Sequence, residues 1–142
     1  MRVSAKADYA VRAMIVLARH AEDGGPLKVE RVAREGDIPP KFLEGIMSEL
    51  RRAGLVDSKR GAEGGYRLAR PAGAVSVAEV LRVVDGPPVL VAGRVPEELA
   101  YPDGLGRLPD LWADAGAAAG GVLEAATLDV LAAAGRALDW QI

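Results

Sequence analysis

The sequence contains no cysteine, and His20 is its single histidine. The absence of cysteine excludes disulfides, thiolate nucleophiles, and zinc or iron–sulfur sites held by the chain's own thiolates. One histidine leaves little for imidazole metal sites or histidine-based catalysis. The carboxylates are scattered, with no nucleophile, base and orienting group in a plausible constellation. We therefore expect a protein that is not an enzyme and that has no metal or other cofactor.

Long apolar runs are also missing. No stretch of 18 apolar residues occurs, and residues 1–6 lead into a helical pattern without the apolar core of a signal peptide. The expectation is a soluble, cytoplasmic protein with no membrane partner. Aromatic residues make up only 4% of the chain, but hydrophobic residues make up 50%, which is enough to bury a core in 142 residues. This length suits one compact domain with an appendage.

Positive charge is scarce in the second half of the chain. Residues 1–70 hold 14 Lys and Arg against 10 Asp and Glu, whereas residues 71–142 hold 4 against 10. The two halves carry charges of +4 and −6, although the net charge is only −2. The basic half is the one we expect to face a polyanion.

The first half of the chain carries the pattern of a helix-turn-helix. Apolar spacing predicts helices over residues 5–21 and 29–35, and then a helix over 40–53 that Pro40 opens and Gly54 ends. The apolar stripe of the third helix comprises Phe42, Leu43, Ile46, Met47 and Leu50. Its opposite face comprises Lys41, Glu44, Gly45, Ser48, Arg51 and Arg52. A short helix, a tight turn and a helix with a polar outer face are typical of DNA-binding units.

A basic hairpin is predicted directly after these helices. Residues 55–59 and 66–70 read as strands, and residues 60–65 form a glycine-rich turn. The basic side chains of this hairpin are Lys59, Arg60, Arg67 and Arg70. An isolated hairpin of this kind would be an ordinary solvated surface feature, but the order of elements favours the wing of a winged-helix domain. A nucleotide-binding loop is disfavoured because a strand follows the glycines and no G-x-x-x-x-G-K-[ST] sequence occurs.

The second half predicts three helices and a long loop. A capping box at Ser76 opens a helix to about residue 85, and residues 87–107 show no sustained period. An alanine-rich helix over 108–126 has one apolar side, which we expect to be a dimer interface. This side comprises Leu108, Leu111, Trp112, Ala115, Ala119, Val122 and Leu123. A final helix over about 127–138 has an apolar stripe that either a second copy of the chain or the chain's own domain must cover.

Three stretches of the sequence resemble one protein family. They are residues 4–13 (SAKADYAVRA), 53–61 (AGLVDSKRG) and 64–68 (GGYRL). Together they strongly resemble the Rrf-two (Rrf2) family of winged-helix transcriptional regulators, in detail over about residues 1–86. That family includes the bacterial iron–sulfur cluster regulator, the nitric-oxide-sensing repressor and the cysteine-metabolism repressor.

The resemblance implies a mainly α fold with a small β-hairpin. A winged helix-turn-helix domain over residues 1–86 would be followed by a loop over 87–107 and by dimerisation helices over 108–142. The implied function is that of a homodimeric, sequence-specific regulator, a repressor, which binds a pseudopalindromic operator in double-stranded DNA. The alternative is a winged-helix protein–protein interaction module without DNA binding, and a continuous basic face over residues 51–70 of the dimer would distinguish the two.

Motif positions imply which side chains meet DNA. Lys41 and Glu44 would face base edges or adjacent phosphates in the major groove, and Arg60 would enter the minor groove. Independently of the resemblance, helix N-termini reach deepest into the major groove, a carboxylate accepts from cytosine N4, and guanidinium suits a narrow minor groove. The alternative for Glu44 is a solvated surface carboxylate. The other candidate contacts, mainly to phosphates, are Ser48, Arg51, Arg52, Lys59 and Arg67.

The chain departs from the family's sensors in the loop over residues 87–107. The resemblance implies three cysteines there, and the loop has none, so no thiolate-held cluster is expected. Asp8 resembles a noncysteine cluster ligand of one branch, and we interpret it as structural. The effector is left open between a small molecule bound between the winged domain and the long helices, a protein partner, and no ligand. Tyr101, Trp112 and Trp140 are candidates for lining a pocket, although large aromatics more often pack in a core or interface.

Overall fold

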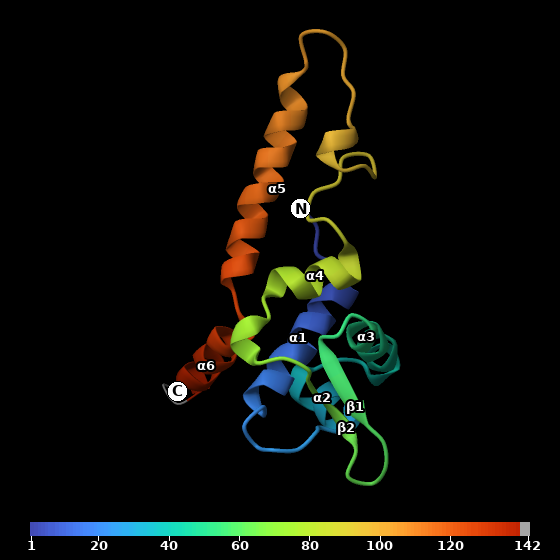
Figure 1. Ribbon diagram of the computed structural model, residues 1–142, viewed down its shortest axis with the longest axis vertical. Coiled ribbons are helices and arrows are strands. Elements are labelled where there is room, and N and C mark those ends of the chain that lie inside the picture. Colours follow the sequence, from blue (N-terminus) through green and yellow to red (C-terminus); the bar gives the residue numbers. More distant parts are fainter. Residues whose placement is uncertain (140–142) are drawn as a thin grey trace.

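The computed structural model describes residues 1–139, with side chains described for residues 1–133. Trp140, a candidate pocket residue, lies outside the described residues. Helices α1 (Ala5–Arg19), α2 (Val29–Gly36) and α3 (Pro40–Arg52) form a helix-turn-helix unit at one end of the molecule (Figure 1). The three helices lie where the sequence predicts them, within two residues at each end.

The apolar stripe of α3 packs against α1 and α2. Its fully buried residues are Leu43, Ile46, Met47 and Leu50. The prediction that Phe42 belongs to this stripe is wrong, because 48% of its surface is exposed. Phe42 lies four residues before the buried Ile46, so its spacing fits the stripe, but in the structure it stands at the edge of the buried face. There its ring stacks on that of Tyr9 in α1, with 6.0 Å between the ring centroids.

The predicted hairpin is present, and the segment before α2 pairs with its second strand. Strands β1 (Val56–Lys59) and β2 (Gly65–Leu68) pair antiparallel and form the only sheet among the described residues. Leu27, just before α2, exchanges two backbone hydrogen bonds of 2.7 and 2.8 Å with Tyr66 of β2. The strands are shorter than predicted by one residue at the start of the first and two at the end of the second. The hairpin is therefore joined to the helix-turn-helix by backbone bonds as well as by packing.

Helix α4 (Val77–Asp85) follows a short 3-10 helix, η1 (Ala72–Ala74). Its start shows half of the predicted capping box, since the backbone N–H of Glu79 donates to the Ser76 hydroxyl at 3.2 Å. The other half is absent because the Glu79 carboxylate binds Arg70 instead.

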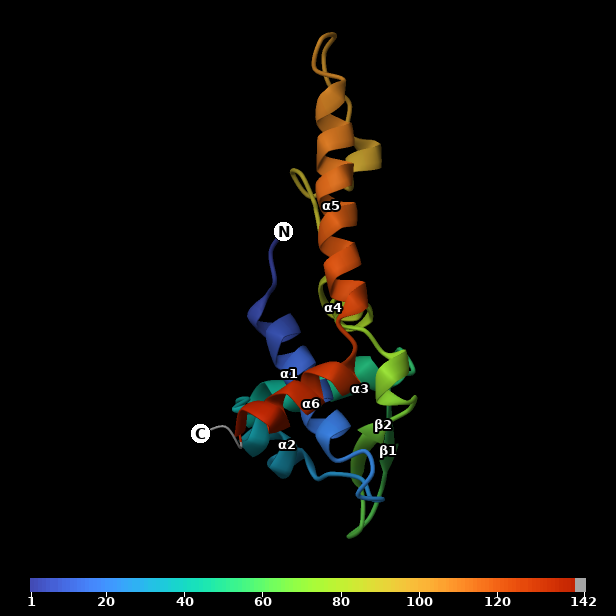
Figure 2. The same cartoon turned by 90° about the vertical axis from the view of Figure 1, so that its left-hand side faces the viewer.

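An arm extends from the winged unit. The loop after α4 contains one 3-10 helix, η2 (Pro96–Glu98), and leads to α5 (Arg107–Ala125). Both views show α5 running the length of this arm, with the loop beside it (Figures 1 and 2). No residue of α5 is buried. No helix among the described residues is both long enough and apolar enough to cross a bilayer.

The final helix, α6 (Leu128–Asp139), returns to the winged unit and packs against α1. Leu128 and Ala132 are buried in the same core as the residues of α1 and α3. The backbone supports this return, because the N–H of Leu128 donates to the carbonyl of Val75 at 3.0 Å. The apolar stripe of this helix was expected to pack either on a second copy of the chain or on the chain's own domain. The chain's own domain covers Leu128 and Ala132. The first part of α6 thus packs into the winged core.

Candidate nucleic-acid interface

The outer face of α3 is polar and open to solvent. Lys41, Glu44, Arg51 and Arg52 are exposed, and Ser48 is half-buried. All five predicted side chains therefore lie away from the buried stripe, on the face that the helix-turn-helix arrangement presents to a groove.

No described acidic residue forms an ion pair with the cations of this face. Arg51 donates to the Ser58 hydroxyl of β1 at 3.3 Å, and the Lys41 ammonium lies 5.0 Å from the centroid of the Phe42 ring. Arg52 has no hydrogen-bond or ion-pair partner in the part of the chain that the structure describes. The carboxylate of Glu49, on the flank of α3, is paired with Lys6 of α1. The helix therefore presents positive charge available to phosphates.

Arg60 lies in the tight turn of the wing. Gly61 has φ +100, which favours glycine, and a Cβ on Gly64 would lie 2.1 Å from the backbone oxygen of Lys59. The ammonium of Lys28, at the start of α2, donates to the Gly61 carbonyl at 3.1 Å. Lys59 and Arg60 are exposed and without partners among the described residues. The end of β1 and the turn thus hold two cations, unpaired among the described residues, on a backbone fixed by glycines and by Lys28.

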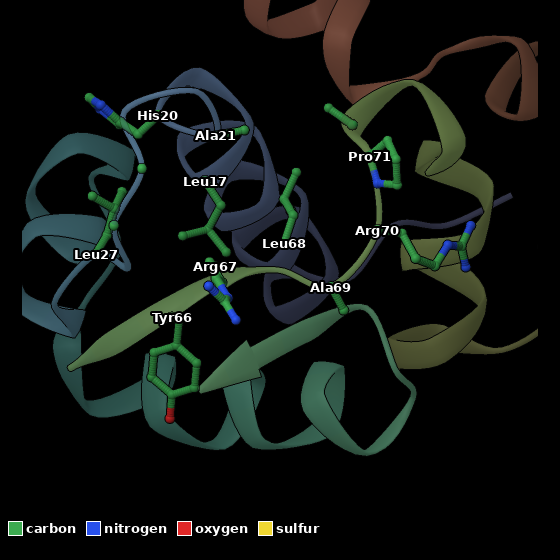
Figure 3. A pocket seen from close by; sticks show the side chains of 13 residues that line it. Leu17, His20, Ala21, Leu27, Tyr66, Arg67, Leu68, Ala69, Arg70 and Pro71 are labelled. Carbon is green, nitrogen blue, oxygen red and sulfur yellow. The ribbon is translucent and has the colours of Figure 1, made fainter. Parts of the chain in front are cut away.

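The structure does not bring Arg67 together with α3. Ser58 contacts Arg51 of α3, and Tyr66 lies opposite Ser58 in the register, so both belong to the face of the hairpin toward α3. Because side chains alternate along a strand, Lys59 and Arg67 belong to the other face. Arg67 lines a cavity beside the wing, which Tyr66 and Leu68 also line (Figure 3). The basic residues of the hairpin are therefore divided between two faces and the turn.

Arg70, the remaining basic residue of the predicted hairpin, is not a free cation. Its guanidinium makes two hydrogen bonds of 2.8 and 2.9 Å to the Glu79 carboxylate, and a further one to the Ala74 carbonyl. The bond from Arg70 lowers the pKa of Glu79. Arg70 thus ties the end of the wing to α4.

The single histidine joins α1 to α2. Nδ1 of His20 lies 2.8 Å from the Asp23 carboxylate, and Nε2 lies 2.8 Å from the Glu35 carboxylate. Both nitrogens can donate only in the imidazolium form, and these bonds, first that to Glu35 and then that to Asp23, raise the pKa of His20. Arg31 also binds Glu35, at 2.7 Å. The cluster is a structural ion-pair network beside the wing.

Sequence reasoning missed two residues of this region, Lys28 and Phe42. The position of Lys28 gives no sign that its side chain reaches the wing turn, 33 residues further on. Phe42 was placed in the apolar stripe, and its distance of four residues from Ile46 agrees with that position, so its exposure depends on tertiary packing that the sequence does not show. Its partner Tyr9 is in turn covered by the guanidinium of Arg12, 5.4 Å from the ring centroid.

The apolar side of α5 is divided between the chain's own loop and solvent. Trp112 is half-buried and donates from its indole nitrogen to the Tyr101 hydroxyl at 3.2 Å. Leu108, Ala119 and Leu123 are also half-buried. Leu111 and Val122 are 54% and 72% exposed, and Ala115 is exposed between them. These three residues form a strip of apolar surface along the arm.

Comparison with known proteins was made for the whole chain. A family model described as "Rrf2: Iron-dependent Transcriptional regulator" matches residues 3–134. Rv1287 of Mycobacterium tuberculosis strain H37Rv, named as a candidate HTH-type transcriptional regulator, is 46% identical over 128 residues, which cover 90% of this chain and 79% of that protein. The HTH-type transcriptional regulator CymR of Bacillus subtilis is 36% identical over 133 residues, which cover 93% of this chain and 90% of CymR.

Solved structures agree with these relatives. CymR of B. subtilis, titled the global cysteine regulator, superposes with a TM-score of 0.77 and 33% identity over 94% of this chain and 97% of that chain. IscR of T. potens superposes with a TM-score of 0.75 and 33% identity over 96% of this chain and 90% of that chain. The winged-helix fold and the helical arm are thus shared with regulators of known structure.

Iron, which the family description implies, does not fit the residues of this chain. The sequence offers no thiolate, and no group of three or more His, Asp or Glu among the described residues could hold a metal. Asp8 is engaged in an ion pair with Arg12 at 2.7 Å. The family match over residues 3–134 and the shared fold nevertheless settle the relationship. The chain belongs to the Rrf2 family of DNA-binding transcriptional regulators, of which it is a cysteine-free member.

Proposed function

We propose that the protein is a homodimeric repressor that binds a pseudopalindromic operator without an iron–sulfur cluster. The single observation that carries this proposal is the set of cations on α3 and in the wing turn that lack partners among the described residues. Lys41 and Glu44 meet base edges in the major groove, and Arg60 enters the neighbouring minor groove. Arg52 and Lys59 contact phosphates and position the domain without reading sequence.

The neighbouring side chains complete this interface. Arg51 can keep its bond to Ser58 and still offer donors to a phosphate, because a guanidinium carries five N–H groups. Ser48 lies one turn beyond Glu44 on the same helix and adds a hydroxyl to the groove-facing surface. Arg67 contacts phosphate only if the DNA reaches around to the second face of the hairpin. It is therefore the weakest member of the proposed set.

The strip formed by Leu111, Ala115 and Val122 supports a dimer. A 19-residue helix with no buried residue gains little stability from its own chain, and an apolar strip of this kind is covered when two copies pack their arms together. A two-fold axis would relate the two α3 helices, so that they read half-sites about 34 Å apart, one helical turn of DNA. The effector, if the repressor has one, would act on this two-fold geometry.

The continuous basic face over residues 51–70 that would distinguish DNA binding from a protein–protein interaction module is only partly formed, because Arg67 lies on the other face of the hairpin and Arg70 is bound to Glu79. We favour DNA binding over the interaction module because the family binds DNA and because the cations of α3 are open. The test is selection of bound fragments from a random double-stranded library, followed by titration at several salt concentrations. We expect a specific site whose affinity falls steeply with salt, because phosphate contacts release counterions. Absence of any enriched site would contradict the proposal, and a promoter–reporter assay would distinguish repression from activation.

A further inference from the structure

A cavity of about 360 Å³ lies between the wing and the end of α1. Three segments enclose it: the end of α1 near Leu17, the loop with Gly24 and Gly25, and residues 66–72 of β2 and its exit (Figure 3). Its volume is within the range of small-molecule sites. It is also separate from the space between the winged domain and the long helices, where the sequence placed a candidate effector.

Apart from the phenol of Tyr66, the ionisable side chains that line the cavity are all basic. They are His20, Arg67 and Arg70, and the lining contains no carboxylate, although the chain has more acidic than basic residues. His20 and Arg70 are already bound to carboxylates outside the lining. Arg67 has no partner in the described part of the chain, and no ion pair joins it to its cross-strand neighbour Asp57. Arg67 is exposed, and an unpaired guanidinium at a cavity can bind an anion through charge-assisted hydrogen bonds.

The remaining walls include Leu17, Leu27, Leu68, Ala21, Pro71 and Ala72. Leu17 and Leu27 are themselves buried, so the apolar surface that a ligand can reach is supplied by Leu68, Ala21, Pro71 and Ala72. A Cβ on Gly24 or Gly25 would meet no atom within 4 Å, so the loop side of the cavity is open and offers an entrance. Phosphate alone would leave these walls uncovered, whereas a molecule with an apolar body would bury them.

We propose that this cavity binds a small organic anion, with its apolar body against the leucine and alanine walls and its carboxylate or sulfonate paired with Arg67. A bound anion bridges β2 of the wing to the loop between α1 and α2, and it occupies the guanidinium that could otherwise reach a DNA phosphate. Binding of the ligand does not depend on the proposed DNA interface. Only its effect on DNA affinity does.

The test uses benzoate and its neutral isostere benzamide as probes at fixed pH and ionic strength. NMR follows the imidazole of His20, whose resonances are unambiguous because it is the only histidine in the chain. We expect saturable shifts with benzoate and at least tenfold weaker binding of benzamide, as for a lost charge-assisted bond. Arg67→Gln should weaken benzoate at least tenfold and remove the preference over benzamide. Arg60→Gln is the matched control and should bind benzoate as the wild type does.

A second variant fills the space without touching the charge. Ala21 is exposed at the rim, so Ala21→Leu should fold normally and lose benzoate binding while it keeps DNA binding. Equal binding of benzoate and benzamide, or benzoate binding unchanged in Arg67→Gln, would overturn the proposal. If Arg67→Gln impaired DNA binding alone, the guanidinium would serve DNA phosphates and the cavity would not be an anion site. A protein that binds benzoate but no DNA would instead refute the proposed function.

Discussion

Replacing Arg60 by alanine tests the wing at an exposed cation of its turn. Arg60 is the first residue after β1, and its side chain has no intramolecular partner among the described residues. The backbone that carries it is fixed independently by Gly61, Gly64 and Lys28. Truncation therefore leaves no unsatisfied group and no cavity. We expect the free energy of unfolding to change by less than about 0.5 kcal/mol, as for surface substitutions away from special features.

The effect on DNA affinity should be much larger. Loss of one well-placed arginine contact to DNA costs about 1–3 kcal/mol, which is roughly a five- to 150-fold rise in the dissociation constant. If Arg60 lies in a narrow minor groove, the loss should be greatest on operators with A·T pairs at that position. If it only neutralises a phosphate, the loss should be uniform across sequences and the salt slope should fall by about one.

Fluorescence anisotropy with a selected operator measures this affinity, and sedimentation checks that the dimer is unchanged. Arg94→Ala is the matched control, because Arg94 is an exposed arginine in the loop after α4, outside α3 and the wing. Its affinity for DNA should equal that of the wild type. An unchanged dissociation constant for Arg60→Ala would refute the role of the wing turn, and equal losses in both variants would reduce that role to a general effect of charge.

Three further predictions concern neighbouring parts of the molecule. Lys28→Met removes the hydrogen bond to the wing turn and should weaken DNA binding roughly two- to tenfold, from the usual net value of one hydrogen bond. The effect of Lys28→Met on DNA affinity should nearly vanish in the Arg60→Ala background. Full additivity in the double-mutant cycle would show that Lys28 does not act by placing Arg60. Val122→Asp places a charge on the apolar strip of α5 and should raise the dimer dissociation constant at least about a hundredfold in sedimentation equilibrium, since an unpaired charge in an interface costs several kcal/mol; an unchanged dimer would place the interface elsewhere. The pKa of His20 is raised above 6.5 in the folded protein, chiefly by Glu35, so the contribution of His20 to stability is fully present below about pH 6.5 and is lost as pH rises through the raised pKa. Urea unfolding should show this loss of stability in the wild type and not in His20→Gln. Identical pH profiles of the two proteins would contradict the ion-pair geometry.

Local patterns determine much of this fold. Pro40 at the first position of α3, the stripe of Leu43 and its partners, and Ser76 at the start of α4 are visible in the sequence because each depends on residues within one or two helical turns. Gly54, which has φ +78 after α3, belongs to the same class. The order of helices and hairpin follows from such signals.

The charges of the wing could not be assigned from the sequence. The ion pair between Arg70 and Glu79 depends on how α4 packs beside the end of β2. A helix that follows a turn can place its carboxylates in many directions, so the sequence does not show this pair. Alternation along β2 predicts that Arg67 and Tyr66 point to opposite faces. Which of these faces meets α3 is fixed by tertiary contacts, such as that between Arg51 and Ser58.

The sequence could not show which surface α6 packs on, for a similar reason. An apolar stripe on a terminal helix indicates that another surface covers it, but it does not indicate which surface. The deciding contacts are the backbone bond from Leu128 to Val75 and the burial of Leu128 in the core around α1. Both join segments more than 50 residues apart, beyond the reach of local pattern.

Hydroxyl-radical footprinting of the dimer on a selected operator tests the central claim most directly, because it reports where two recognition helices and two wings meet one DNA face. We expect two equivalent protected segments about one helical turn apart, each flanked by a minor-groove contact that disappears in Arg60→Ala. A single protected segment, or protection that does not respond to the wing substitution, would contradict the account of α3 and the wing as one DNA-reading surface repeated by two-fold symmetry.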